Sequence, residues 1–567
     1  MKERQTRRLP VLLSILLLCL WQTTLAQNIT VRGRVTSADK PDGVPGISVT
    51  VQGSTNGTTT DDGGRYQLTG VPGTANLVFT SIGFKTQTVA VKGQTTVNIV
   101  LEASEASQLE QVVVIGYGTA KKKDLTGAVA SVKATQLENE HPASIQDVLR
   151  GNVAGLNVGF TASPKGDVSL EVRGRNTLNA GSSPLIVLDG IIYYGALADI
   201  NPSDIESIDV LKDASSAAVY GAKAASGVIQ VTTKKGRSDK PVINVNSSVG
   251  VASMSVNEHV YNAQDFLNVW RRNAQYSTHV NAKPYEYDDP RTLPSSISIA
   301  EWQAYDNSTT DPVITWLQRL NLQPVEVANY NKGQSIDWYD MVFRNGIRQD
   351  YNVSLSGRKE GINYYWSLGY MNNEGVVDLD DYSVVRSRLN VDAKVTNFLS
   401  VGTNTQFSIR DESAVPVDWT LITSNSPWGS YYNDDSSLLR FRPNDEVSGG
   451  NNPYGVPTYT NRMQKYYELN ASIYAKVSLP FDIKYQINFT PRFEWYNYFN
   501  GESALWQEWT NLGGRATREN RTIYQWQIDN LITWSRDIAR YHHVDVTLLA
   551  NSEKYQMWSN SMTNTGF

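Results

Sequence analysis

The sequence predicts a multi-domain, mainly β chain: an N-terminal β-sandwich, a small α/β domain and an antiparallel transmembrane β-barrel that is incomplete in this chain. Three observations carry this prediction. Residues 27–103 hold short β-branched segments separated by turns, and residues 121–238 hold strands that alternate with short helical segments. From residue 239 to residue 567, long segments alternate between apolar and polar side chains. A chain of 567 residues is long enough for several such domains.

Composition narrows the function classes only slightly. The net charge of −5 gives no general attraction to nucleic acid, so no nucleic-acid partner is expected. Charged residues make up only 19% of the chain while aromatic residues reach 10%. Many aromatic and few charged residues suit a surface that meets lipid or sugar, but a large all-β protein has the same composition.

The N-terminus has the pattern of a secretory signal peptide over residues 1–26. Four basic residues precede the apolar run Val11–Leu20, and Ala26 is a small residue suited to cleavage. The apolar run is about 10 residues long, whereas a membrane-spanning helix needs roughly 20. The single cysteine, Cys19, lies inside this segment, so the mature chain is expected to form no disulfide.

Residues 27–103 predict a small sandwich of about seven short strands. Thr30–Val35, Ile47–Val51 and Leu77–Thr80 are strand-like, and Asp61–Gly64 supplies a turn. Residues 104–120 then form a polar linker that contains the β-branched stretch Gln111–Gly118.

Residues 121–238 predict an α/β domain. A short helix is expected between Pro142 and Gly151, and a second is expected to start at Asp213 and end at Gly221. Strands are expected at four places: Ser169–Arg173, Pro184–Gly190, Ile205–Leu211 and Gly227–Lys234.

Residues 239–567 show the period-two alternation of membrane strands, for example over Leu389–Thr396 and Val401–Arg410. We expect strands of about 9–12 residues, the length that crosses a bilayer at a tilt. The alternation stops over residues 256–336 and 412–465, which are expected to be outer loops because periplasmic turns are short. The alternative is a large soluble β-sandwich.

Several motifs resemble known families. Gly33-Arg34-Val35, Thr60–Tyr66 and Ser81–Phe84 look like the carboxypeptidase-regulatory-like domain, a module without catalysis. The ordered series from Arg173 to Gly236 closely resembles the plug domain of SusC/RagA-type TonB-dependent outer-membrane transporters. The plug residues singled out are these: Arg173, Gly174, Asp189, Gly190, Lys212, Asp213, Tyr220 and Gly221.

The resemblance implies TonB-dependent import of an oligosaccharide or peptide nutrient across the bacterial outer membrane. It implies a SusD-like surface lipoprotein as partner, the TonB protein with its ExbB/ExbD motor, outer-membrane lipid around the barrel, and an N-terminal domain and plug on the periplasmic side. The alternatives are a non-transporting secreted binding or signalling module and an inactive truncated product of such a transporter.

The stretch before the plug is the expected TonB box, at Val112, Val113, Val114 and Ile115. An exposed β-prone segment on a linker can add a strand to the sheet of a partner, with main-chain hydrogen bonds supplying the affinity. The alternative is an edge strand that packs on the neighbouring domains.

Loop aromatics are candidates for ligand contact, chiefly Trp270, Tyr287 and Trp302. Aromatic faces suit the apolar side of a sugar ring, although such residues more often pack loops together. No catalytic residue, cofactor or metal is predicted. His542 and His543 are adjacent in a strand and face opposite ways, so they cannot bind one ion together.

The barrel is expected to be incomplete. Full members of the family close about 22 strands, whereas residues 241–567 allow only about ten to twelve. Trp558–Gly566 does not alternate and is not expected to be an amphipathic strand.

Overall fold

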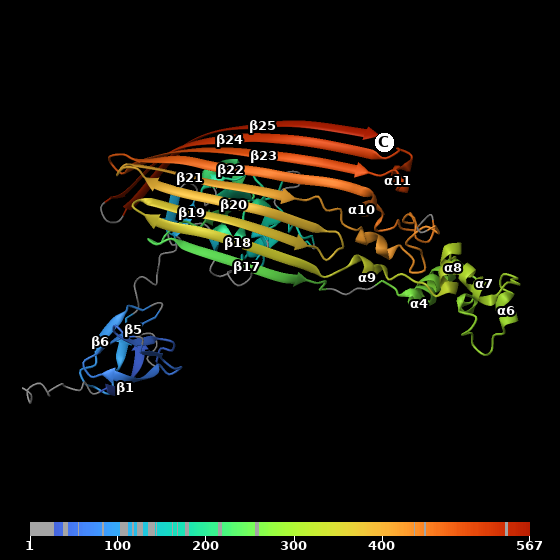
Figure 1. The fold of residues 1–567 in the computed structure, drawn as a ribbon, viewed down its shortest axis with the longest axis horizontal. Helices are drawn as coiled ribbons and strands as arrows, with labels where there is room; N and C mark the ends of the chain where they lie inside the picture. The colour runs from blue at the N-terminus through green and yellow to red at the C-terminus, as the bar shows by residue number, and fades with distance from the viewer. Residues whose placement is uncertain are drawn as a thin grey trace, which may run out of the picture. The chain divides into compact units, whose positions relative to one another are not determined.

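The computed structural model describes most of the chain, and it divides into two compact units that we describe separately (Figure 1). The units are Met1–Val113 with Lys121–Asp124, and Val114–Ala120 with Leu125–Phe567. The described residues are 28–37, 43–54, 56–81, 84–102, 112–115, 118–121, 129–133, 142, 144–161, 163–166, 168–175, 181–213, 218–255, 260–435, 437–446, 449–538 and 542–566. The predicted signal peptide lies outside them.

The first unit contains the predicted β-sandwich. One sheet has the order β4-β1-β7 and the other has the order β3-β2-β5-β6. The strands are β1 (Asn28–Ser37), β2 (Ser48–Val51), β3 (Gly57–Thr59), β4 (Arg65–Pro72), β5 (Asn76–Thr80), β6 (Gln87–Ala90) and β7 (Ile99–Leu101).

Alternate residues of these strands form one apolar core between the two sheets. Val35, Val49 and Phe79 are fully buried, and the Tyr66 ring packs edge-on against Phe79 at 5.6 Å between centroids. The Tyr66 hydroxyl donates to Val97 O at 2.8 Å, so its polar end is satisfied inside the core. The period-two pattern read from the sequence is therefore the pattern that fills this core.

The plug of the second unit is a mixed sheet with the order β10-β15-β16-β13-β14. Its strands are β10 (Val129–Lys133), β13 (Leu185–Leu188), β14 (Ile191–Ile192), β15 (Ile205–Leu211) and β16 (Val228–Thr233). Around it lie α2 (Ile145–Leu149), β11 (Leu156–Val158), β12 (Leu170–Val172), η4 (Leu197–Asp199), η5 (Pro202–Asp204) and η6 (Ala218–Ala224). The helix expected to start at Asp213 falls mainly on residues 214–217, which lie outside the described residues. The segment that follows, η6, is a 3-10 segment on both sides of Gly221.

The predicted short helix after Pro142 is confirmed as α2, and the sequence explains its limits. Ser144 caps it, because the Ser144 hydroxyl accepts from Asp147 N at 3.2 Å. Gly151, just past its end, has a φ of 75°, a conformation that glycine adopts at no steric cost.

The wall of the second unit is one antiparallel sheet of nine strands in sequence order, β17 to β25, with the plug strands behind it in Figure 1. The strands are β17 (Val242–Ala252), β18 (Gly346–Lys359), β19 (Ile362–Glu374), β20 (Asp381–Lys394), β21 (Leu399–Asp411), β22 (Thr460–Ser478), β23 (Ile483–Glu502), β24 (Arg515–Ile538) and β25 (His542–Thr565). Among the described strands, β17 and β25 each pair on one side only, so the barrel is not closed.

Two expectations about these strands, their length and their number, are wrong. The strands are 11 to 24 residues long rather than about 9–12. The described part of residues 241–567 therefore forms nine wall strands instead of the expected ten to twelve. Trp558–Gly566 is also mostly strand, since β25 pairs with β24 along its whole length up to Thr565 opposite Arg515. Backbone pairing to a long neighbour thus forms a strand where side-chain alternation is absent.

The long connections lie at one end of the wall, and the first of them is helical rather than irregular (Figure 1). Between β17 and β18 lie α4 (Ala263–Asp265), η7 (Phe266–Arg271), α5 (Arg272–Thr278), η8 (Pro284–Tyr287), α6 (Ile299–Gln303), α7 (Pro312–Arg319), α8 (Pro324–Lys332) and α9 (Trp338–Val342). The later connections hold η9 (Trp419–Thr423), α10 (Gly455–Tyr459) and α11 (Gln507–Thr510). Within the described part of the chain, every helix is too short or too polar to cross a membrane.

The helical connection packs onto the connection between β21 and β22. The Asn329 amide donates to Trp428 O and to Gly429 O, both at 2.9 Å. The Trp338 indole donates to Ser426 O at 2.9 Å, and the rings of Tyr330 and Trp428 lie 5.0 Å apart. These buried contacts join two segments about a hundred residues apart into one body above the wall.

We predict that Gly33→Ala destabilises the β-sandwich. A Cβ atom at Gly33 would lie 1.8 Å from Val97 O, so β1 and the segment before β7 must move apart, which typically costs about 1–3 kcal/mol. Urea unfolding of the isolated residues 27–103, which contain their own core, measures the loss. Gly63→Ala is the control, because its Cβ would meet only Asp61 Oδ1 at 3.5 Å. Equal unfolding midpoints for the two variants would contradict the prediction.

Candidate functional site

The β13–β14 hairpin of the plug places a charged residue, Asp189, in contact with the wall. Leu188 pairs with Ile191, so the turn consists of Asp189 and Gly190, whose φ values of 50° and 88° fit a type I′ turn. Asp189 Oδ1 accepts from Thr233 N at 2.9 Å, which fixes the end of β16. The Asp189 carboxylate also forms an ion pair with Arg388 of β20, and both side chains are buried.

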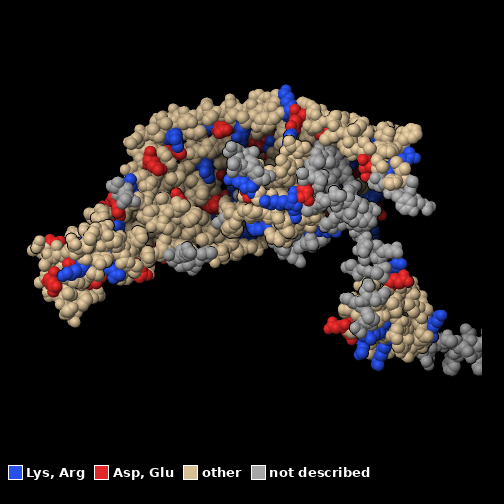
Figure 2. Space-filling model, turned by 180° about the vertical axis from the view of Figure 1, so that it is seen from behind, with Lys and Arg blue, Asp and Glu red and all other residues tan. Residues whose placement is uncertain are grey.

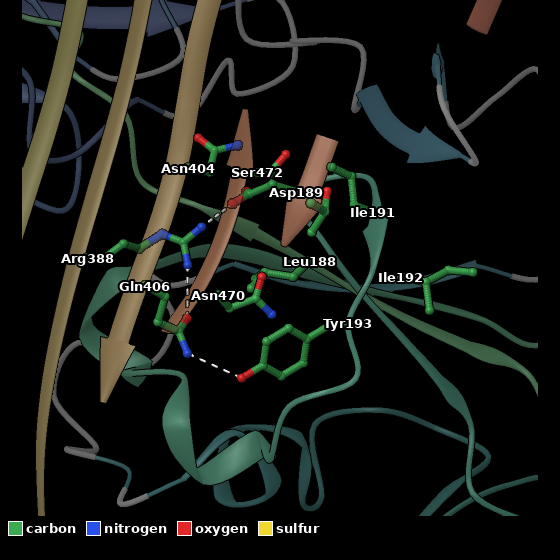
Figure 3. Close-up of a pocket in the computed structure, with 11 residues that line it drawn as sticks. Leu188, Asp189, Ile191, Ile192, Tyr193, Arg388, Asn404, Gln406, Asn470 and Ser472 are labelled. Carbon is green, nitrogen blue, oxygen red and sulfur yellow. Dashed lines mark hydrogen bonds and ion pairs between the residues drawn. The ribbon is translucent and has the colours of Figure 1, made fainter. Parts of the chain in front are cut away.

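Further wall residues orient Arg388 (Figure 3). Its guanidinium donates to Asn390 Oδ1 at 3.1 Å and to Gln406 Oε1 at 3.2 Å. The Gln406 amide in turn donates to the Tyr193 hydroxyl of the plug at 3.2 Å and to Asp199 O at 3.0 Å. The buried cation is therefore compensated by a charge and by a hydrogen-bond network, as burial in a region of low dielectric requires.

A cavity of about 20 Å³ lies beside this ion pair, with plug residues Leu188–Tyr193 on one side and wall side chains on the other (Figure 3). Three of its lining oxygens, on Asn404, Ser472 and Thr490, are buried and have no protein partner. A space of this size with several polar partners fits one water molecule.

The segment that follows the hairpin makes a second row of polar contacts with the wall. Asp199 Oδ1 accepts from the Ser408 hydroxyl at 2.7 Å and lies 2.9 Å from Arg410 Nε. The Asn201 amide donates to Asn352 Oδ1 at 2.9 Å. These plug residues come from the short turns η4 and η5, and Asn201 also caps η5 by accepting from Ser203 N at 3.0 Å.

Asp204 ends this row. Its Oδ1 accepts from the Tyr365 hydroxyl of β19 at 2.8 Å, in a fully buried position. Burial raises the pKa of the Asp204 carboxyl above its usual value, although the positive charge of Arg388 and the hydrogen bond from Tyr365 act in the opposite direction.

The plug is therefore a folded body that docks through polar contacts. Its two apolar clusters, as far as the described residues show, contain plug residues only. Charged residues of both signs gather in the hollow of the second unit (Figure 2). A buried ion pair adds little net stability, but leaving one of its charges without the other is costly. These pairs therefore favour one position of the plug against the wall.

The remaining plug motif residues hold the plug itself together. Arg173 and Gly174 take φ values of 57° and 84°, and Arg173 forms an ion pair with Asp213 at 2.5 Å. The Lys212 ammonium donates to Ala154 O. Tyr220 is buried in an apolar cluster, which raises the pKa of its hydroxyl, and Gly221 has a φ of 62°.

The expected TonB box coincides with strand β8 (Val112–Ile115), which pairs only with β9 (Gly118–Lys121) in a two-stranded sheet. The side chains of Val112, Val113, Val114 and Ile115 lie outside the described residues. An isolated pair of strands is marginally stable in water.

The expectation for the loop aromatics is largely not met. Trp302 and Tyr287 are 0% and 2% exposed, in the apolar cluster of the helical connection, and so offer no ring face to a ligand. Trp302 packs under Arg319, whose guanidinium lies 3.6 Å from its ring centre. Trp270, 50% exposed, keeps an accessible ring. In the described part of the chain no three metal-ligating side chains gather into a site.

Sequence reasoning missed the residues that make the interface: Asp199, Asn201, Asp204, Arg388 and Arg410. The sequence signal for these residues was the presence of charged side chains in the middle of a predicted strand, such as Arg386-Ser387-Arg388. Arg388 faces the plug, which supplies the carboxylate that compensates it.

We predict that Arg388→Gln loosens the plug, because it leaves the buried Asp189 carboxylate without its cation, a loss of about 3–5 kcal/mol. The temperature at which trypsin cleaves the plug in detergent should fall, and Asp189→Asn in the same molecule should restore most of the loss. Arg237→Gln is the control, since its ion pair with Glu206 is exposed and exposed pairs contribute about 0–1 kcal/mol. Equal effects of Arg388→Gln and Arg237→Gln would refute the role of the pair.

Two family models match the chain. The TonB-dependent Receptor Plug Domain matches residues 121–228, and the CarboxypepD_reg-like domain matches residues 31–114.

Curated relatives cover nearly the whole chain. TonB-dependent receptor P39 of Formosa agariphila is 29% identical over 96% of this chain and 48% of its own length. TonB-dependent receptor SusC of Bacteroides thetaiotaomicron is 28% identical over 91% of this chain and 48% of its own length. The chain thus spans about half the length of the curated relatives it matches.

A solved structure has the same fold. The RagAB peptide importer in its open-open state aligns with a TM-score of 0.62 and 20% identity, over 81% of this chain and 50% of the solved chain. The two domain models and the curated relatives support a SusC/RagA-type TonB-dependent receptor, and the solved structure shows that the fold is shared.

Proposed function

We propose that this chain forms the N-terminal part of a TonB-dependent importer in the bacterial outer membrane, with the sandwich and plug on the periplasmic side. The observation that carries the proposal is the seating of the plug: a self-contained domain held against the wall by directional polar contacts. Such contacts can break and re-form as a set, whereas a shared apolar core would unfold with the barrel.

The coupling point in this proposal is β8. Val112–Ile115 precedes the plug in the chain and pairs with β9 alone. TonB pairs one of its strands with this segment and transmits force from the ExbB/ExbD motor. The force reaches the plug through the chain that joins β8 to the plug. Main-chain hydrogen bonds supply the affinity for TonB. The segment therefore needs β-branched residues, which favour a strand, and no charged side chain.

The cargo in this proposal is an oligosaccharide or peptide nutrient, and a SusD-like lipoprotein covers the outer mouth. SusC and the RagAB importer, as relatives in sequence and in fold, support this assignment. The packed body formed by the two long connections supports a partner at this end of the wall, because it presents a fixed surface. No catalytic step is part of the proposal.

We predict that Val113→Pro abolishes TonB binding and uptake, because proline removes a main-chain donor and cannot continue the added strand. The measurements are binding of the purified periplasmic domain of TonB to a peptide of residues 104–120, and nutrient uptake by cells that produce the transporter. Ala106→Pro, in the linker before β8, is the matched control and should leave both unchanged. Normal TonB binding by Val113→Pro would rule out this coupling point.

A further inference from the structure

The outer face of the β4-β1-β7 sheet in the first unit carries a row of arginines. Val31 and Val35 of β1 are buried in the core of the sandwich. Because alternate strand residues face opposite sides, Arg32 and Arg34 lie on the outer face of the same strand. Arg65 of β4 is the cross-strand partner of Arg34, so three guanidinium groups share this face.

Two of these arginines repel each other in the folded domain. Arg34 and Arg65 lie directly opposite, where Cβ atoms are about 4.5–5.5 Å apart and like charges are destabilising. In the described part of the first unit, no carboxylate forms an ion pair with Arg32 or Arg65. Asp61 closes the turn before β4 instead, since its Oδ1 accepts from Gly63 N at 3.0 Å and from Arg65 N at 2.8 Å. The row therefore keeps a surplus of positive charge.

A groove of about 530 Å³ lies over this row. Besides the three arginines, its lining includes Thr58, Thr59 and Gln67, whose side chains both donate and accept hydrogen bonds. Asp61 is the one acidic residue among the described residues of the lining. Three positive charges against one negative charge make the groove attractive to an anionic ligand.

The spacing of the row fits an extended acidic peptide. Arg32 and Arg34 are two residues apart on a strand, a separation of about 6.6–6.8 Å. An extended peptide carries alternate side chains with the same repeat, so carboxylates at alternate positions meet successive guanidinium groups. The hydroxyl groups of Thr58 and Thr59 and the amide of Gln67 are suited to bind the main chain of such a segment.

Two other kinds of polyanion match the groove less well. Single-stranded nucleic acid binds through stacking on aromatic side chains as well as through charge. The aromatic side chain of the lining, Tyr66, is only 4% exposed. Attachment to an anionic lipid surface gains strength from apolar side chains that enter the bilayer. The described lining offers no exposed apolar side chain for this purpose.

We propose that this groove is a docking site for an extended acidic segment of a partner protein, which pairs with Arg32, Arg34 and Arg65. In the orientation proposed above, the partner is a periplasmic protein. The binding itself needs neither the plug nor TonB, because the groove lies wholly within the first unit.

The test uses residues 27–103, which hold both sheets and the core between them. The probe is a fluorescent peptide with the sequence Gly-Glu-Ser-Glu-Ser-Glu-Gly and blocked ends, and its binding is followed by anisotropy at low salt. The same peptide with glutamine for every glutamate should not bind. A peptide of equal composition with the glutamates contiguous should bind more weakly, because neighbouring side chains face opposite sides. High salt should weaken the binding of the alternating peptide.

Variants of the domain locate the site. Arg32→Gln and Arg65→Gln should each weaken binding about fivefold, the contribution of one exposed ion pair. Lys92→Gln removes the same charge outside the lining and is the matched control, which should bind as the unaltered domain does. Arg65→Gln should also raise the urea midpoint, because it removes the repulsion from Arg34. A purely structural role for Arg65 would not combine weaker binding with higher stability.

Equal weakening by Arg32→Gln and Lys92→Gln would mean attraction to net charge alone and would overturn the site. Equal binding of the alternating and contiguous peptides overturns the spacing argument, and preferred binding of oligothymidylate or phosphatidylglycerol vesicles overturns the peptide assignment. A lower urea midpoint for Arg65→Gln would refute the repulsion, and no binding of the probe to the folded domain at low salt would refute the proposal. Since residues 27–103 do not include β8, these outcomes are independent of the coupling proposal.

Discussion

The ion pair between Asp189 and Arg388 is the contact on which the seating of the plug depends. It joins the tip of a tight hairpin to the middle of a wall strand, and both partners are buried. A carboxylate or a guanidinium in such a place is stable only while its partner is present. The plug therefore has one position against the wall, and the contacts of Asp199, Asn201 and Asp204 follow from that position.

This arrangement separates two kinds of stability within the second unit. The plug keeps its own apolar clusters, and the wall is held by continuous antiparallel pairing from β17 to β25. Among the described residues, the hydrogen bonds and ion pairs at the boundary alternate with spaces, the small cavity beside Arg388 and the larger one beside Arg410. A boundary of this kind allows movement of one body without unfolding the other.

The candidate site was only partly predictable. The plug motif pointed to Asp189, Gly190, Arg173 and Asp213, and the structure places each at a turn or in an ion pair. Their wall partner Arg388 was missed, because sequence alternation tells which face a strand residue takes but not which domain covers that face. Two of the loop aromatics, Trp302 and Tyr287, were expected to be accessible because their segment looked irregular in the sequence. The segment folds into short helices, and both side chains are buried in the apolar cluster between them.

Local periodicity and turn residues were enough to predict the β-sandwich, the α/β character of the plug and the antiparallel wall, because one segment carries each of these patterns alone. Tertiary structure decided the strand lengths, the fold of the first long connection and the strand over Trp558–Thr565. It also decided which charges meet between the plug and the wall. These features depend on backbone pairing and burial between segments far apart in the chain, which no local pattern encodes.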